Sequence, residues 1–285
     1  MKWIRNTLLI TALSLSPLIA AKAQSNQEVK TISVSDFTYA DFVDITLMSP
    51  IIASVEVTRA KKLSAKLAPD LQEGKTRFYI EAKVSSLIRG ADGLAGNISY
   101  LLDVPNDEKG HAKRIPEKTR FLIFGQPVSG HPDQIMLTRP DSNLDWDPKS
   151  EAVVSGITRE ILSNSPAPQI TSITSAFYVP GSVPGESETQ IFLQTISKQP
   201  ISLNILRRPQ EKPQWAVALG EMTDEAATPP APNSLLWYRL ACGLPRNIPQ
   251  SVLSTLSAHD MIAVADDYKV VLAGLGACSR NHHFK

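Results

Sequence analysis

The sequence predicts an α+β protein in which a small β-barrel with flanking helices is followed by a four-stranded antiparallel sheet with C-terminal helices. Three observations lead to this fold class. Five runs rich in β-branched and aromatic residues lie between two helical patterns in the first half of the chain. Four more such runs, joined by Pro- and Gly-rich turns, follow a short proline-rich segment. The remainder of the chain carries apolar residues at helical spacing.

The first half opens with a helix, predicted from about Phe37 to Met48. Asp36 is placed to cap its first turn, and Ser49-Pro50 ends it because proline disfavours helical backbone in the residue before it. Within the second predicted strand, Phe78, Ile80 and Ala82 alternate with Arg77, Tyr79 and Glu81, as expected for a strand with one buried face. The predicted strands are Ile51–Thr58, Thr76–Leu87, Asn97–Val104, Thr119–Phe124 and Gln134–Thr138.

A second helix is predicted from Asp147-Pro148 to about Ser163, because these two residue types favour the first helical positions. Ser165-Pro166-Ala167-Pro168 then forms a short, stiff linker. We therefore divide the chain into a barrel domain, residues 24–164, and a second domain, residues 169–285. The helix that begins at Asp147-Pro148 is expected to bury an apolar stripe of Val153, Ile157, Ile161 and Leu162.

The second domain is predicted to begin as a β-meander and to end as helices. Asn233 or Ser234 caps a helix that begins at Leu235 and ends near Gly243, and Pro249 opens another helical turn. His259 is placed to cap a long final helix. The predicted strands are Ile170–Tyr178, Thr189–Thr195, Ile201–Leu206 and Trp215–Leu219, and the core stripe of the final helix is Met261, Val264, Ala265, Tyr268, Val271, Leu272 and Leu275.

Residues 1–23 have the pattern of a cleavable signal peptide. Lys2 and Arg5 precede a mostly apolar stretch, and Ala21-Lys22-Ala23 supplies the small residues of a cleavage site after Ala23. The stretch falls short of the roughly 20 apolar residues that span a bilayer. We expect a periplasmic or secreted protein with no stable membrane insertion after cleavage.

The charge of the chain is nearly balanced. Cleavage after Ala23 removes three basic residues and no acidic one, which leaves 26 of the 29 basic residues against 28 acidic ones. Such a chain offers no cationic field for nucleic acid. Two basic clusters, Arg59–Lys62 and Lys109–Arg120, are interpreted as solvated loops.

The two cysteines, Cys242 and Cys278, are predicted to form a disulfide, because an oxidising compartment favours their pairing. Two buried free thiols are the alternative. Cys278 is expected to extend the apolar face of the last helix. In a plain antiparallel hairpin it would then lie about 10 Å short of Cys242 at 1.5 Å per residue. The bond therefore needs a crossed or near-parallel arrangement of the helices, or a bend at Gly274 or Gly276.

The sequence carries no established catalytic, cofactor or metal motif. Asp141–Asp147 imitates the opening of a calcium loop, but Trp146 stands where the loop requires glycine, and Ala152 stands where it requires glutamate. We interpret this stretch as a polar turn that ends in a helix cap at Asp147. His282 and His283 are interpreted as part of a frayed polar tail. We predict no metal, no cofactor and no catalytic residue.

Three aromatic residues next to proline-rich turns are candidates for contact with a partner. Exposed aromatic side chains often anchor protein partners. Burial between the sheet and the helices is the alternative. The three candidates are Trp215, Trp237 and Tyr238.

Five segments along the mature chain carry a resemblance to a known family: Ser35–Phe42, Gly185–Thr195, Leu206–Pro209, Trp215–Glu221 and Leu236–Cys242. In these segments the chain resembles a family of uncharacterised exported proteins from alphaproteobacteria. The resemblance implies export but assigns no site residue.

Residues 36–163 have the predicted order helix, five strands, helix, with Leu87-Ile88-Arg89-Gly90 at the end of one strand and Arg120–Phe124 in a later one. In this order and these motifs the segment is similar to netrin/TIMP-like OB barrels, small secreted modules that often bind other proteins. The resemblance implies an OB-like barrel. The amino-terminal cysteines through which that family inhibits proteases are absent from this sequence.

We therefore expect a non-catalytic exported protein that binds, assembles with or inhibits another protein of the cell envelope. The alternative is a periplasmic hydrolase whose active-site residues are dispersed along the sequence. The sequence leaves the partner, the oligomeric state and the choice between these two functions open.

Overall fold

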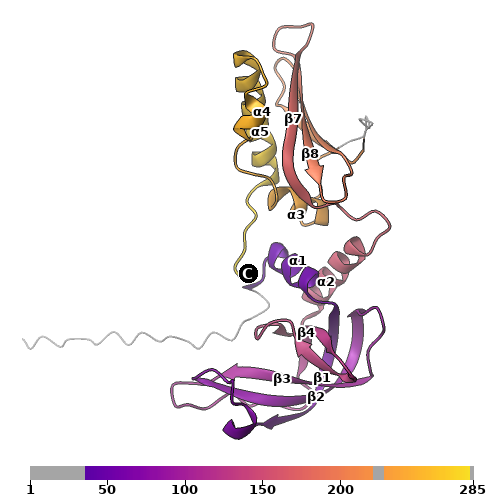
Figure 1. The fold of residues 1–285 in the computed structure, drawn as a ribbon, viewed down its shortest axis with the longest axis vertical. Coiled ribbons are helices and arrows are strands. Elements are labelled where there is room, and N and C mark those ends of the chain that lie inside the picture. The colour runs from indigo at the N-terminus through magenta and orange to yellow at the C-terminus, as the bar shows by residue number, and fades with distance from the viewer. Residues whose placement is uncertain (1–35, 221–227, 283–285) are drawn as a thin grey trace, which may run out of the picture. The chain divides into compact units, whose positions relative to one another are not determined.

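The structure is a computed structural model that describes residues 36–220 and 228–282. It contains a closed five-stranded barrel with helices and a separate four-stranded antiparallel sheet with C-terminal helices (Figure 1). The predicted α+β class is therefore confirmed. The predicted signal peptide, residues 1–23, lies outside the described residues.

Five strands form the barrel, and a sixth short strand extends it. The order is β1-β2-β3-β5-β4-β6, and β1 also pairs with β4, which closes the barrel. All neighbouring pairs are antiparallel except β3 and β5. The strands are β1 (Ile51–Lys62), β2 (Lys75–Arg89), β3 (Asn97–Pro105), β4 (Arg120–Val128), β5 (His131–Leu137) and β6 (Asn143–Asp145).

The alternation predicted for β2 is confirmed. Phe78, Ile80 and Ala82 are buried, whereas the residues between them face outward. Gly125 of β4 is required where this strand crosses β5, because a Cβ atom there would lie 2.4 Å from Ile135 Cγ2 and 2.9 Å from the carbonyl oxygen of Met136.

Two helices, α1 (Tyr39–Met48) and α2 (Pro148–Ile161), flank the barrel strands in the chain. The first begins two residues later than predicted. Thr38 rather than Asp36 is its N-cap, in a capping box with Asp41. The predicted cap of α2 is confirmed, since Asp147 accepts hydrogen bonds from the backbone N–H groups of the first turn.

The apolar stripe predicted for α2 is shifted. Val154 and Ile157 are the fully buried residues, and Leu162 lies beyond the helix with 63% of its surface exposed. The interpretation of Arg59–Lys62 as a loop is also wrong. These residues are the exposed end of β1 and pair with β2, because the pairing continues past the buried part of the strand.

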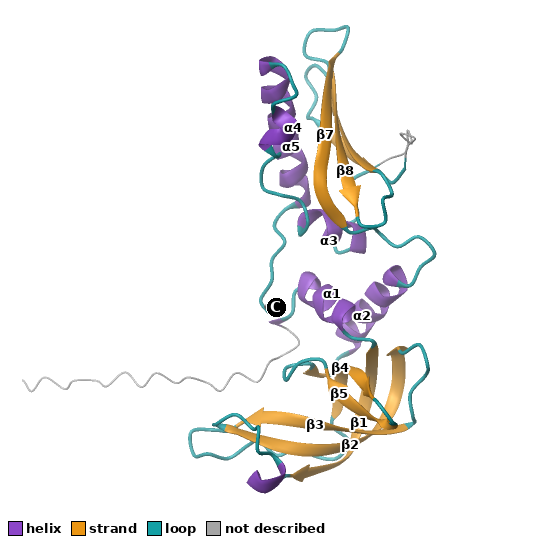
Figure 2. Cartoon of the chain, in the orientation of Figure 1, coloured by secondary structure: helices purple, strands orange, loops and turns teal. Residues whose placement is uncertain are grey.

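The second sheet has the order β10-β9-β8-β7 and is entirely antiparallel, which confirms the predicted meander. Helices α4 and α5 lie beside it (Figure 2), and α5 contacts β7, β8 and β9. The strands are β7 (Ile170–Pro180), β8 (Ser187–Thr195), β9 (Ile201–Arg207) and β10 (Gln214–Ala218), and the helices are α3 (Leu235–Ala241), α4 (Gln250–Leu253) and α5 (Ala258–Leu275).

The caps of these helices agree with the prediction except at α5. Ser234 caps α3, as one of the two candidates, and Pro249 precedes α4. Ser257, not His259, caps α5, because its hydroxyl accepts the backbone N–H of Asp260. His259 is the second residue of the helix and is exposed.

Three clusters of buried side chains organise the described residues. One fills the barrel, and one lies between the second sheet and helices α3 to α5. The third joins α1, α2 and strand residues of the barrel to Leu235 and Tyr238 of α3.

The linker Ser165–Pro168 has neither helix nor strand, and the division into separate domains at this linker stays a prediction. Among the described residues, no helix combines the length and the apolar character needed to cross a membrane.

Asp267 is a buried charge within the apolar stripe of α5. Its side chain is 1% exposed and accepts hydrogen bonds from Arg207 of β9, at 2.5 Å, and from the hydroxyl of Thr189 of β8. The pair links the helix to two strands of the sheet. The carboxylate of the preceding residue, Asp266, is exposed and pairs with Lys269 at 2.8 Å.

Asp267→Ala is expected to lower the free energy of unfolding by about 2–3 kcal/mol, since it leaves Arg207 and Thr189 without their acceptor. We place the loss below that of a fully buried pair because Arg207 is 35% exposed and can be hydrated. Asp266→Ala is the matched control and is expected to cost less than about 1 kcal/mol. Equal losses in urea unfolding would contradict the assigned role of Asp267.

Candidate functional site

A groove of about 410 Å³ lies on the outer surface of the barrel. Strands β2, β3 and β5 and the segment that follows β5 line it. The lining residues are Asp70, Arg77, Tyr79, Ser99, Tyr100, Leu101, Asp103, Val128, Gln134, Ile135, Met136, Leu137, Thr138, Arg139 and Pro140.

The groove follows the line where β3 and β5 separate. These two strands run parallel and pair only at Ser99 with Gln134 and at Tyr100 with Ile135. Beyond these pairs, Leu101 and Asp103 face Met136 to Pro140 across the groove. A short parallel contact is sufficient here, because the barrel is held closed by the longer pairing of β1 with β4.

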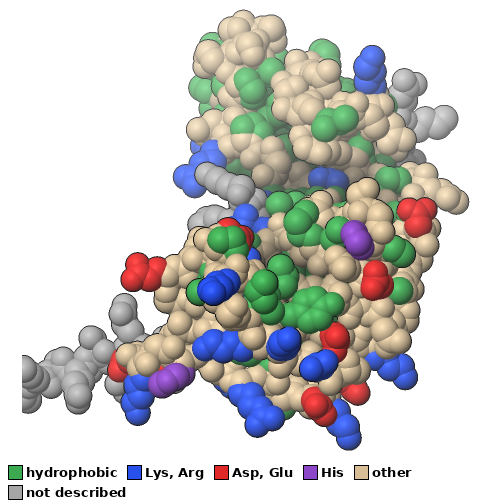
Figure 3. Space-filling model, turned by 60° about the horizontal axis from the view of Figure 1, so that its bottom comes forward, with side chains coloured by type: hydrophobic (Ala, Val, Ile, Leu, Met, Phe, Trp, Pro, Cys, Tyr) green, Lys and Arg blue, Asp and Glu red, His purple; other side chains and the backbone are tan. Residues whose placement is uncertain are grey.

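Apolar side chains at outward positions form part of the groove surface. Leu101 is 47% exposed and Met136 is 53% exposed, and Tyr79 is half-buried beside them. Figure 3 shows apolar side chains gathered on the surface of the barrel with Lys and Arg side chains around them. Exposed apolar groups inside a groove are typical of binding surfaces rather than of an ordinary solvated strand.

A fixed polar group borders this apolar surface. Arg77 donates to both carboxylate oxygens of Asp103, at 2.6 and 2.8 Å, and to Asp70 at 2.7 Å. Its hydrogen bond holds the pKa of Asp70 below the ordinary value for aspartate, and the two carboxylates raise the pKa of Arg77, the bond to Asp103 most of all. The guanidinium is therefore always charged and held in one orientation.

The residues of this groove were missed by the sequence analysis. The detectable signal was the run Tyr100-Leu101-Leu102, in which an apolar residue occupies the outward position between two buried ones. In a half-exposed strand that position is ordinarily polar.

The three predicted partner-binding aromatics lie elsewhere. Trp215 of β10 packs so closely on α5 that a Cβ atom at Gly274 would lie 2.4 Å from its indole nitrogen. Trp237 is half-buried and donates from its ring nitrogen to the carbonyl oxygen of Leu275 at 2.8 Å. Tyr238 is 8% exposed, and its hydroxyl donates to Asp44. None of the three lines the groove, and their role toward a partner stays a prediction.

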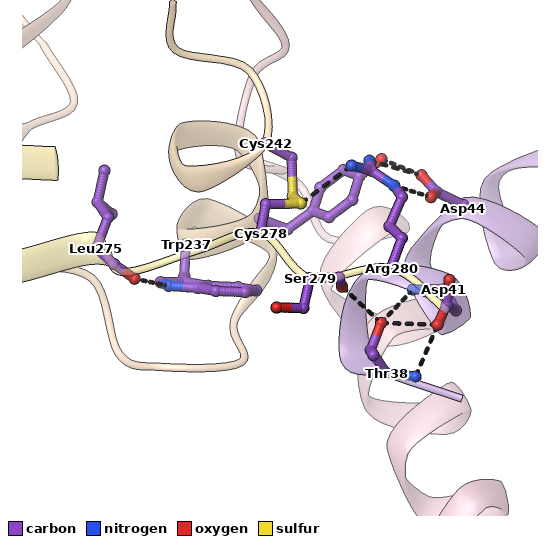
Figure 4. Close-up of a disulfide and its surroundings, with 10 residues drawn as sticks. Thr38, Asp41, Asp44, Trp237, Cys242, Leu275, Cys278, Ser279 and Arg280 are labelled. Atoms are coloured by element: carbon purple, nitrogen blue, oxygen red, sulfur yellow. Dashed lines mark hydrogen bonds and ion pairs between the residues drawn. A yellow bond between two sulfur atoms is a disulfide. The ribbon is translucent and has the colours of Figure 1, made fainter. Parts of the chain in front are cut away.

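The predicted disulfide between Cys242 and Cys278 is present, with the two Cα atoms 5.2 Å apart (Figure 4). Cys242 is the C-cap residue of α3. Cys278 does not extend the face of α5, because that helix ends at Leu275 and Gly276 has a φ of 71°. The bend at Gly276, one of the two positions expected from the sequence, turns the chain back toward α3.

The segment after the disulfide docks on α1, so its interpretation as a frayed tail is wrong for residues up to His282. Arg280 donates to Asp44 at 2.5 and 3.3 Å (Figure 4). The backbone N–H groups of Asn281 and His282 donate to the two carboxylate oxygens of Asp41 at 3.1 and 3.0 Å. His283 lies outside the described residues.

The calcium-like stretch is engaged in other contacts. Asn143 accepts a hydrogen bond from Tyr100 at 2.8 Å, Asp141 pairs with Arg139, and Asp147 caps α2. The central part of the stretch is strand β6 rather than a turn, because Leu144 is fully buried and pairs with Leu122 of β4. Within residues 36–220 and 228–282, no three His, Cys, Asp or Glu side chains are grouped to hold a metal ion.

No protein-family model matches this chain, and no curated protein matches its sequence. A functional assignment therefore rests on the geometry of the groove. That geometry combines exposed apolar side chains, a fixed guanidinium between two carboxylates, and a strand edge without a partner along part of its length.

Replacing both Cys242 and Cys278 by serine is expected to lower the free energy of unfolding by about 3–4 kcal/mol, because the unfolded chain regains the freedom of the opened loop. Urea unfolding measures this loss. The wild-type protein in excess reductant is expected to reach the same stability. An unchanged unfolding midpoint in either sample would contradict a stabilising disulfide.

The hydroxyl group of Tyr238 is expected to make the free energy of unfolding depend on the pH. Burial raises the pKa of its hydroxyl to about 12, and the hydrogen bond to Asp44 acts in the same direction. The unfolded chain loses this proton near pH 10. The folded protein therefore holds one proton more between about pH 10 and 12, and its stability falls across that interval as the pH rises.

Tyr238→Phe removes this contribution, so the free energy of unfolding of the variant is expected to fall less steeply, by up to about 1.4 kcal/mol per pH unit, between pH 10 and 12. Urea unfolding at a series of fixed pH values compares the two slopes. Parallel slopes for the two proteins would show that the hydroxyl is not held in its protonated form.

Proposed function

We propose that this protein is a non-catalytic, exported binding protein whose barrel groove takes up an extended segment of another protein of the cell envelope. The observation that carries the proposal is the groove along the separation of β3 and β5, with Leu101 and Met136 about half exposed inside it. The proposal includes a signal peptide that is cleaved after Ala23.

The composition of the groove supports a polypeptide ligand. Protein interfaces combine an apolar centre with a polar rim, and they are enriched in aromatic residues, methionine and arginine. Tyr79, Met136 and Arg77 supply these residue types. The carboxylates of Asp70 and Asp103 balance the charge of Arg77, so the groove does not favour a polyanion.

The exposed edge of β3 supports an extended conformation of the ligand. After Tyr100 the strand pairs with β2 on one side only, and among the described residues no strand pairs with its other edge. An added strand can use main-chain hydrogen bonds for affinity and side-chain pockets for specificity. Alternate side chains of such a strand point to the same face, so every second residue of the ligand meets Leu101 and Met136.

One finding is compatible with export. The Cys242–Cys278 disulfide is of the kind that persists in oxidising compartments. Periplasmic or secreted localisation is part of the proposal.

A selection of displayed random peptides on the immobilised full chain tests this function. The selected peptides are expected to alternate apolar and polar residues and to lose at least tenfold in affinity for Met136→Lys, measured by calorimetry. The substitution is at an exposed position and is expected to leave the melting temperature nearly unchanged.

Ile262→Lys on α5 is the matched control, because Ile262 is 65% exposed and lies outside the groove. Selected peptides are expected to bind this variant like the wild type. The proposal is overturned if no sequence is enriched, or if the enriched peptides bind Met136→Lys and Ile262→Lys equally well.

A further inference from the structure

A second pocket has a volume of about 480 Å³. It is formed by the end of α2 and the linker, by the turn between β8 and β9, and by α3. Its volume is in the range of small-molecule sites. The lining residues are Ile161, Asn164, Ser165, Pro166, Ala167, Pro168, Gln169, Ile196, Ser197, Gln199, Leu235 and Arg239.

Arg239 is the charged residue of this pocket, and its charge is not compensated. Its Nε atom is buried and has no hydrogen-bond partner in the described parts of the chain. The carboxylate of Glu160, on the neighbouring α2, accepts a hydrogen bond from the backbone N–H of Leu235 instead, at 2.7 Å. Burial lowers the pKa of Arg239, because the surroundings disfavour the charged form.

Several other partly buried arginines of the described chain are paired with carboxylates, whereas Arg89 donates to the carbonyl oxygens of Thr46 and Ser49 and Arg120 lies over the ring of Trp146. Arg77 binds Asp70 and Asp103, Arg207 binds Asp267, and Arg280 binds Asp44. Among the described residues, Arg239 has no carboxylate partner, and its guanidinium carbon lies 5.8 Å from the ring centre of Tyr238. Removing part of a guanidinium from water without an anion costs free energy, which the charge of a bound ligand can offset.

We propose that this pocket binds a small organic anion whose carboxylate or phosphate group pairs with the guanidinium of Arg239. The planar guanidinium offers parallel N–H donors that match both kinds of oxyanion. The side chains of Asn164, Ser165, Gln169, Ser197 and Gln199 supply further hydrogen-bonding groups at the pocket surface. Ile161, Pro168 and Leu235 supply apolar contacts for the uncharged part of the ligand.

The test is a titration of the full chain with inorganic phosphate and, separately, with citrate, at an ionic strength held constant with sodium chloride. Binding is followed by calorimetry and by the NMR signal of the Arg239 Nε–H group. At least one probe is expected to bind saturably and to shift that signal. Saturation by phosphate alone indicates phosphate-bearing ligands, and saturation by citrate alone indicates carboxylates.

Arg239→Gln is expected to reduce the affinity for the bound probe at least tenfold. Arg246→Gln removes the same charge from an exposed position outside the pocket and is expected to bind like the wild type. Without anion, Arg239→Gln is expected to melt at a temperature no lower than the wild type, since no protein group loses a partner. A purely structural arginine would instead lower it.

Two results overturn the proposal. One is that neither probe saturates the wild-type protein at concentrations up to about 50 mM, which is far weaker than binding in the millimolar range. The other is equal affinity of Arg239→Gln and Arg246→Gln for the probe. Both results are independent of the groove on the barrel, because no residue lines both sites.

Discussion

The pairing of β1 with two neighbours is the constraint from which the form of the barrel follows. One edge of β1 pairs with β2 over most of its length, and the other edge pairs with β4 from Ile51 to Glu56. Once these antiparallel contacts close the barrel, β3 and β5 meet in parallel and share only two residue pairs. The strands then diverge, and the groove is the space that they leave. The groove is thus a consequence of how the strands close into a barrel.

A second set of contacts ties the amino-terminal helix to residues far along the chain. Asp44 of α1 lies between Arg280 and the hydroxyl of Tyr238, which belongs to α3. The disulfide joins Cys242, at the end of α3, to Cys278 and thereby holds Arg280 near this helix. Apolar side chains of α1, α2 and α3 pack together around these polar contacts. The Asp44 side chain is 17% exposed, so water screens its ion pair only weakly, and three hydrogen bonds offset the cost of removing the carboxylate from water.

Much of the fold was predictable because strand and helix periodicities are local. Alternation in residues 75–82 and the meander after Ser165–Pro168 were evident from the order of apolar residues, and Asp147 and Ser234 were recognisable as caps. What escaped prediction depends on distant contacts. Leu144 belongs to a strand only because β4 lies beside it. Asp267 is tolerated in a core stripe only because Arg207 and Thr189 reach it. The groove arises from the divergence of two strands, which no single segment encodes.

The double role of Asp41 has a consequence for the timing of folding. This carboxylate caps the start of α1 and also receives the backbone N–H groups of residues 281 and 282, the latter 241 positions further along the chain. Helix α1 therefore cannot acquire these contacts until the segment around residues 281 and 282 has reached it. The earliest described helix is therefore among the last elements to acquire its full set of contacts. A chain that ends before residue 278 also lacks the partner of Cys242, so an incomplete product carries a free thiol that the finished protein does not.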